Sequence, residues 1–174
     1  MQKDTIAIHA GYDKKSGNGE MAIPISQTTA YAFRDAEHAA NLFALKELGP
    51  IYTRLNNPTN DILEQRYAQL ENGAAALVTA SGASAIFYSI ANIAEAGDNI
   101  LISDKLYGGS VTLFHFTLKR FGISVKTFKS DDASDLESLV DDKTKGIFFE
   151  SLSNPQIAIP AIEKIVEVAK KHGI

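Results

Sequence analysis

The sequence predicts an α/β fold in which a mostly parallel sheet is covered by helices on both faces. Short apolar runs of strand length alternate with longer segments whose apolar residues recur at helical spacing. Glycines, small residues and helix-capping residues stand at the junctions between these segments. Strands that alternate with helices are typical of parallel sheets, because each helical crossover returns the chain to the same edge.

The N-terminal third reads differently from the rest. Residues 1–33 show no sustained period and include a turn-forming stretch at 14–19, so we expect an arm. Asp35 is expected to cap a helix over 36–48 that stops at a Gly-Pro pair. A further helix is expected over 60–71, where apolar residues fall at i, i+4 and i+7.

We divide the chain into an arm and helix, residues 1–60, expected at a dimer interface, and the first part of an α/β domain, residues 61–174. In a βα series the last helix should lead into another strand, so we expect the chain to be truncated. The expected strands cover 75–79, 99–103, 123–128 and 146–150. The expected helices are 81–95, a helix ending at Gly122, a short helix opened by a capping box at 134–137, and a last helix with Ile162, Ile165, Val166 and Ala169 on one face.

Composition narrows the class of protein. The 174 residues are 45% apolar and 22% charged, as in ordinary globular domains, and the net charge of -4 gives no reason to expect nucleic acid as a partner. No apolar run is long enough to cross a membrane, and the first residues do not resemble a signal peptide, so a cytoplasmic protein is expected. Cysteine is absent, and the four histidines lack metal-ligand spacing, so we expect no metal site.

Residues 79–85 are all small, follow an expected strand and open an expected helix. The unpaired N–H groups at a helix N-terminus can hold a phosphate, and Gly82 would let the anion approach the backbone. The alternative is a tight turn with Ser81 as a structural cap. Neither a dinucleotide fingerprint nor a Walker loop is present.

Three other segments carry polar or aromatic residues beside turns. Arg54, in the turn-rich stretch 51–59, could offer its planar fork to a phosphate, or it could be a solvated loop residue. Tyr107 lies just beyond a strand end, where ligands of open α/β sheets gather, although a Tyr beside two glycines can also simply form a turn. Asn154 follows another strand end and could bind a ligand oxygen, or Asn-Pro could form a turn alone.

The order of these segments resembles that of the Cys/Met-metabolism family of pyridoxal 5'-phosphate (PLP) enzymes, which has the aspartate aminotransferase-like fold (fold type I). The resemblance covers essentially all 174 residues. Residues 35–47 and the Tyr52-x-Arg54 that follows resemble the O-acetylhomoserine sulfhydrylase branch, whereas cystathionine synthases and lyases usually differ there. The matching positions are Tyr52-x-Arg54 with Asn57-Pro58-Thr59, Ser81-Gly82, Tyr107-Gly108-Gly109 and Glu150-x-x-x-Asn154-Pro155.

The resemblance implies two sources of phosphate binding. Tyr52 and Arg54 would reach across a dimer interface to the PLP phosphate of the neighbouring subunit. The backbone N–H groups of Gly82 and Ala83, beside Ser81, would bind the phosphate of their own subunit. Many relatives carry Gln or Met at the position of Ala83, a change that keeps the backbone donor and bears on the shape of the substrate pocket.

The resemblance also implies how the rest of PLP would be held. Tyr107 would stack on the pyridine ring, and Asn154 would lie near the 3′ oxygen with Glu150 close behind it. Tyr107 and Tyr52 are the implied catalytic residues of this chain. The family's Asp at the pyridine nitrogen, its Schiff-base lysine and its substrate-carboxylate Arg have no match here, so we expect the chain to be inactive alone. Lys105 is the lysine nearest to these segments.

The activity implied is a γ-replacement in methionine biosynthesis. O-acetylhomoserine would exchange acetate for sulfide or a thiol, giving homocysteine with sulfide, in a dimer or a dimer of dimers (a homotetramer). The acyl group and the thiol donor stay open. One alternative is cystathionine γ-synthase, cystathionine γ-lyase or methionine γ-lyase activity. Another is a non-catalytic binding or assembly module.

Overall fold

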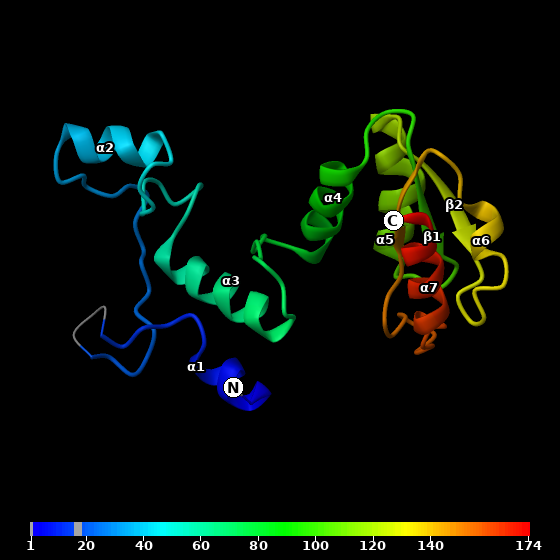
Figure 1. Cartoon of the computed structure of the whole chain (residues 1–174), viewed down its shortest axis with the longest axis horizontal. Coiled ribbons are helices and arrows are strands. Elements are labelled where there is room, and N and C mark those ends of the chain that lie inside the picture. The colour runs from blue at the N-terminus through cyan, green and yellow to red at the C-terminus, as the bar shows by residue number, and fades with distance from the viewer. Residues whose placement is uncertain (1, 16–18) are drawn as a thin grey trace. The chain divides into compact units, whose positions relative to one another are not determined.

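A computed structural model describes residues 2–15 and 19–174, so part of the expected turn at 14–19 lies outside the described residues. The chain forms two compact units, Met1–Val78 and Thr79–Ile174 (Figure 1). The boundary that we expected after residue 60 falls inside α3 (Pro58–Leu70). None of the helices in the described ranges is long and apolar enough to cross a membrane.

The first unit contains α1 (Lys3–His9), α2 (Ala36–Phe43) and α3. Asp35 caps α2 as predicted, because its side chain accepts the N–H of His38. The prediction that this helix runs to residue 48 is wrong. Leu45 adopts a positive φ of 54°, and the N–H of Lys46 bonds to the carbonyl of Asn41, which closes the helix in a Schellman motif.

Asn57 fixes the start of α3 and the chain beside it. Its side-chain oxygen accepts the N–H of Thr59, and its amide nitrogen donates to the carbonyl of Ser26 at 2.9 Å and to Oγ1 of Thr53 at 3.1 Å. Only 5% of Asn57 is exposed, so its polar atoms are satisfied internally. This residue therefore joins the arm to the segment that carries Tyr52 and Arg54.

The second unit is a parallel three-stranded sheet in the order β2-β1-β3. Its strands are β1 (Asn99–Ser103), β2 (Ser124–Phe128) and β3 (Thr144–Phe148), and all of β1 is buried. Alternate residues of β1 face opposite sides, so Ile100 and Ile102 belong to one apolar cluster and Leu101 to the other. The predicted α/β architecture with helices on both faces is confirmed.

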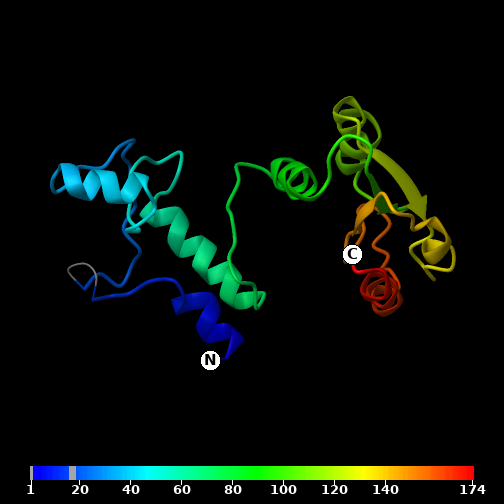
Figure 2. The same ribbon diagram turned by 45° about the horizontal axis from the view of Figure 1, so that its top comes forward.

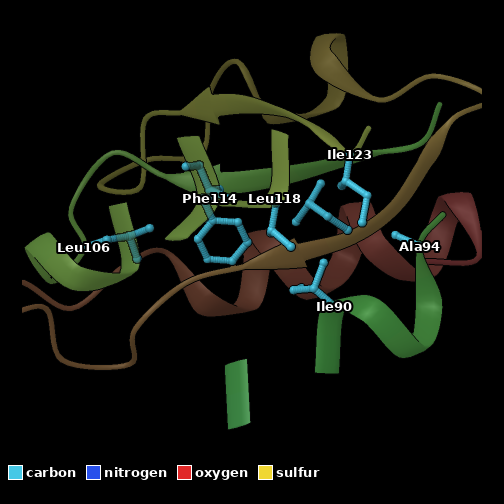
Figure 3. Close-up of a cluster of buried hydrophobic side chains, with 8 residues drawn as sticks. Ile90, Ala94, Leu106, Phe114, Leu118 and Ile123 are labelled. Carbon is cyan, nitrogen blue, oxygen red and sulfur yellow. The ribbon is translucent and has the colours of Figure 1, made fainter. Parts of the chain in front are cut away.

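The two apolar clusters lie on opposite faces of the sheet. Figure 3 shows Phe114 and Leu118 of one cluster facing Ile90 of α4 (Gly82–Ile93) and Ala94, the residue that follows this helix. The other face is covered by α6 (Leu136–Leu139) and α7 (Ile162–His172), the latter ended by Gly173 at a φ of 69°. In Figure 2, α7 (red) and the yellow-green helical segment after β1 lie on opposite sides of the strands.

The strand predicted over 75–79 does not form. A strand requires a neighbour, and the strands of the described sheet pair only with one another. The N–H of Val78 instead donates to Oε1 of Glu64 at 2.9 Å, and Leu77 remains 75% exposed. The local sequence shows that residues 75–79 are mostly apolar, but it does not show whether another strand lies beside them.

Two helix predictions also need correction. The helix expected before Gly122 ends there as predicted, but it is built of α5 (Gly108–Thr112), the π-helical η1 (Leu113–Thr117) and the 3-10 helix η2 (Leu118–Phe121). The capping box is wrong, because Asp135 is the N-cap of α6 without a side-chain cap bond, and its carboxylate accepts the N–H of Lys129 instead. The last helix forms as predicted, and of its apolar residues Ile165 is buried with Val168, whereas Ile162 and Val166 are exposed.

Side-chain hydrogen bonds connect the residues at the edge of the sheet where the strands begin, here called the amino edge. Asn99, 3% exposed, donates to Oδ1 of Asp141 at 2.8 Å and accepts from Oγ1 of Thr144 at 3.0 Å. Hydrogen bonds from Lys126 and then from Asn99 hold the pKa of Asp141 well below its usual range. The polar groups at this edge are thus occupied with one another.

Candidate functional site

The opposite end of the strands, here called the carboxyl edge, gathers the candidate residues of the second unit. Tyr107 follows the end of β1, and Glu150 and Asn154 follow the end of its neighbour β3. The last residue of helix α4, Ile93, lies against Gly146 of β3, and α4 also contacts α5, which begins beyond the end of β1. The N-terminus of α4 therefore points toward the carboxyl edge.

Ser81 builds that N-terminus. Its Oγ accepts the N–H of Ser84 at 3.1 Å and lies 2.9 Å from Oγ of Ser84, and its carbonyl accepts the N–H of Ala85. The first helical turn is thus closed by one side chain and one carbonyl, as expected of an N-cap. The alternative of a structural cap is correct for Ser81, and it does not exclude a ligand at the same helix end.

The amides of Gly82 and Ala83 remain available in this turn. Neither N–H donates to a protein acceptor within the described residues, and both residues are exposed. A Cβ built on Gly82 would meet nothing within 4 Å, so no other group packs against the side-chain position of this residue. Free N–H groups at a positive helix end suit a phosphate, and this part of the chain therefore fits the phosphate of PLP.

Replacement of Ser81 by Ala should destabilise the protein by about 1 kcal/mol, because the N–H of Ser84 loses its acceptor. Ser89 of the same helix is the matched control, since its hydroxyl only bonds back to the carbonyl of Ala85. The measurement is the melting temperature of the apoprotein at fixed concentration. Equal melting temperatures of Ser81→Ala and Ser89→Ala would contradict the capping role.

A single carboxylate links the two loops at the carboxyl edge. Oε1 of Glu150 accepts the N–H of Tyr107 at 3.0 Å and contacts Oγ of Ser110 at 3.4 Å. Its Oε2 accepts the N–H of Asn154 at 3.2 Å. The carboxylate of Glu150 thus brings together Tyr107, Ser110 and Asn154, which are up to 47 positions apart in the sequence.

Tyr107 and Asn154 turn outward from this carboxylate. Tyr107 is 56% exposed, and Asn154 is exposed as well, so both residues are available to a ligand. Ser110, which is buried, was not singled out from the sequence. The signal that could have found it is a small polar residue in the first turn of a helix that begins at a strand end.

Polar contacts also hold Asp104 and Lys105, which precede Tyr107 in the loop after β1. Ser130 donates its N–H at 3.0 Å and its hydroxyl at 2.7 Å to Oδ1 of Asp104. Burial acts to raise the pKa of Asp104, but the hydrogen bonds from Ser130 and the nearby Lys105 outweigh it and hold the pKa below its usual value. Lys105 forms an ion pair with Asp131, so this lysine already has a carboxylate partner.

Tyr52 and Arg54 lie in the first unit. Tyr52 forms an antiparallel bridge with Ala30, and its carbonyl accepts the N–H groups of Leu55 and Asn56. Arg54 stands at the tip of the resulting turn, with its guanidinium 5.0 Å above the ring of Tyr52. No carboxylate of the described residues lies within ion-pair distance of it. The fork of Arg54 is therefore free to bind an anion.

The same turn borders an open pocket within the first unit. The residues that line the pocket are mostly apolar or aromatic: Ala30, Tyr31, Phe33, Phe43, Ile51, Tyr52, Arg54 and Leu55.

Among the described residues, no group of three or more His, Asp or Glu side chains is placed to hold a metal ion.

Comparison with known families gives one match along almost the whole chain. The family model described as Cys/Met metabolism PLP-dependent enzyme matches residues 4–174. A curated relative, homocysteine synthase of Schizosaccharomyces pombe, is 45% identical over 171 residues, which are 98% of this chain and 40% of the relative. The chain thus spans about two fifths of the length of this relative.

Two solved structures resemble the chain in fold. A Campylobacter jejuni protein described as an O-acetylhomoserine (thiol)-lyase, which contains a pyridoxyl-lysine monophosphate, is 50% identical with a TM-score of 0.94. It is matched by 100% of this chain, over 43% of its own length. The cystathionine γ-lyase of Lactobacillus plantarum is 28% identical with a TM-score of 0.87, over 99% of this chain and 42% of its own.

Proposed function

We propose, since this chain belongs to the Cys/Met-metabolism family of PLP-dependent enzymes, that the whole enzyme replaces the acetoxy group on Cγ of O-acetylhomoserine with sulfide or a thiol, so that acetate leaves. With sulfide the products are homocysteine and acetate. The observation that carries this proposal is the set of unoccupied groups at the carboxyl edge. The free backbone N–H groups of α4 suit the phosphate of PLP, the exposed ring of Tyr107 suits its pyridine ring, and the exposed side-chain amide of Asn154 suits its 3′ oxygen. The higher identity to an O-acetylhomoserine lyase than to a cystathionine γ-lyase supports the choice of substrate.

Each candidate residue has a part in holding the cofactor. The N–H groups of Gly82 and Ala83, at the turn closed by Ser81, bind the phosphate. Tyr107 stacks its ring on the pyridine, and Asn154 approaches the 3′ oxygen. The carboxylate of Glu150 holds both residues in place by accepting their backbone N–H groups.

Tyr52 and Arg54 serve the active site of a neighbouring subunit in this proposal. Their free cation and hydroxyl would complete the phosphate site there, which makes a dimer, or a dimer of two dimers, the active form. The dimer interface assigned to residues 1–60 and the cytoplasmic location stay predictions.

The bound cofactor supplies an electron sink for the carbanion chemistry. The residues of this chain would orient it: the phosphate ligands would hold its phosphate, and Tyr107 would stack on its ring. Tyr107 and Tyr52 carry hydroxyls at the cofactor and are the catalytic candidates of this chain. Charge placement and orientation are thus the contribution of residues 1–174.

The test is to assay the whole enzyme loaded with PLP, first with O-acetylhomoserine or O-succinylhomoserine as donor and sulfide or cysteine as acceptor, and then with cystathionine or methionine alone. We expect homocysteine from O-acetylhomoserine and sulfide, with kcat/KM at least about tenfold above that of every other pair. Faster formation of cystathionine would favour a cystathionine γ-synthase. Faster cleavage of cystathionine or methionine would favour the corresponding γ-lyase. A protein that binds no PLP and converts none of these would be the non-catalytic module.

A further inference from the structure

The ring of Tyr107 lies against the backbone of Gly109. A Cβ built on Gly109 would stand 2.5 Å from Cε1, 3.1 Å from Cδ1 and 3.4 Å from Cζ of that ring. Carbon atoms in contact are normally about 3.5–4.0 Å apart, so a methyl group and the ring cannot share this space. The preceding residue, Gly108, differs: a Cβ built there would meet nothing within 4 Å.

Backbone conformation does not account for Gly109. Neither Gly108 nor Gly109 is among the glycines with positive φ, and both belong to the first turn of α5, where alanine is the better helix former. Of the two neighbouring glycines, only Gly109 therefore needs to lack a side chain, and the reason is the ring above it.

We propose that Gly109 is a positioning residue for Tyr107. This inference rests on the proposed function, in which the ring of Tyr107 stacks on PLP. Tyr107 is held at two points: its backbone N–H donates to Oε1 of Glu150, and one part of its ring rests on Gly109. Because 56% of Tyr107 is exposed, the ring still has a surface to offer the cofactor. An alanine at position 109 would displace the ring by about 1 Å to restore normal contact.

The experiment compares Gly109→Ala with Gly108→Ala in the whole holoenzyme. We expect Gly108→Ala to retain the wild-type PLP affinity and circular dichroism of the cofactor band. Gly109→Ala should change that dichroism and lower kcat/KM by roughly tenfold or more, since misplacement on the ångström scale has such effects. Its apoprotein should melt no lower than that of Gly108→Ala, which separates a displaced ring from a damaged fold.

A double-variant cycle tests whether the effect passes through the ring. In a Tyr107→Ala background, adding Gly109→Ala should change neither PLP affinity nor the dichroism. An undiminished effect in that background would overturn the proposal, as would identical behaviour of the two glycine variants. A wild-type protein that binds no PLP would instead defeat the proposed function, before the variants are compared.

Discussion

Replacement of Arg54 by Ala is expected to raise the Kd for PLP by roughly 10- to 150-fold, which corresponds to the loss of about 1.5–3 kcal/mol for a hydrogen bond to a charged group. The guanidinium has no carboxylate partner among the described residues and rests only on the ring of Tyr52, so little else depends on it. Ala83→Gly is the control, because the donor at that position is a backbone N–H. Equal losses of affinity in the two variants would show that the phosphate lies elsewhere.

Subunit mixing decides which site Arg54 serves. Arg54→Ala and Tyr107→Ala proteins, dissociated and reassembled in equal amounts, should recover about a quarter of the wild-type activity. Half of the dimers are then mixed, and each mixed dimer has one site with an intact Tyr107 and an intact Arg54 from the neighbour. If Arg54 served its own subunit, no mixed dimer would contain an intact site and no activity would return.

Glu150→Ala is expected to lower kcat/KM by roughly 100-fold, because it releases Tyr107 and Asn154 together. Glu150→Gln should recover only part of this loss. Both carboxylate oxygens now accept N–H groups, whereas an amide presents one oxygen and one NH₂ group, which would face a donor.

The control for Glu150 is Glu163→Gln, an exposed carboxylate at the start of α7. The readouts are kcat, KM and the absorption of bound PLP, measured on the same preparations. A positioning role predicts an altered cofactor spectrum in both Glu150 variants. Wild-type spectra and kinetics in Glu150→Ala would refute that role.

Local signals were sufficient for much of the fold. The bounds of β1 agree with the prediction, and Asp35 and Ser81 cap their helices as expected, since a strand's apolar run and a cap depend on neighbours in sequence. The predictions that failed depend on residues far away in the sequence, or on a second hydrogen-bond partner that replaces the expected one. Residues 75–79 are apolar but lack a strand to pair with, and Asp135 bonds back to Lys129 instead of closing a capping box.

The site shows the same division. The sequence order pointed to Tyr107, Glu150 and Asn154, and the structure gathers these three at one edge. The sequence could not reveal that the carboxylate of Glu150 joins Tyr107 to Asn154, because Tyr107 and Glu150 are 43 residues apart. Nor could it distinguish Gly109 from Gly108, since only the resting place of the ring separates them.

The locked amino edge has a consequence for how such a protein can change over generations. Asn99, Asp141, Thr144 and Lys126 satisfy one another there, so a substitution among them exposes an unmet partner and weakens folding. The loops after β1 and β3 also carry exposed side chains, such as those of Tyr107 and Asn154, that make no hydrogen bond within the described residues. Mutations that alter substrate preference can therefore accumulate in these loops while selection for stability acts on the opposite end of the strands.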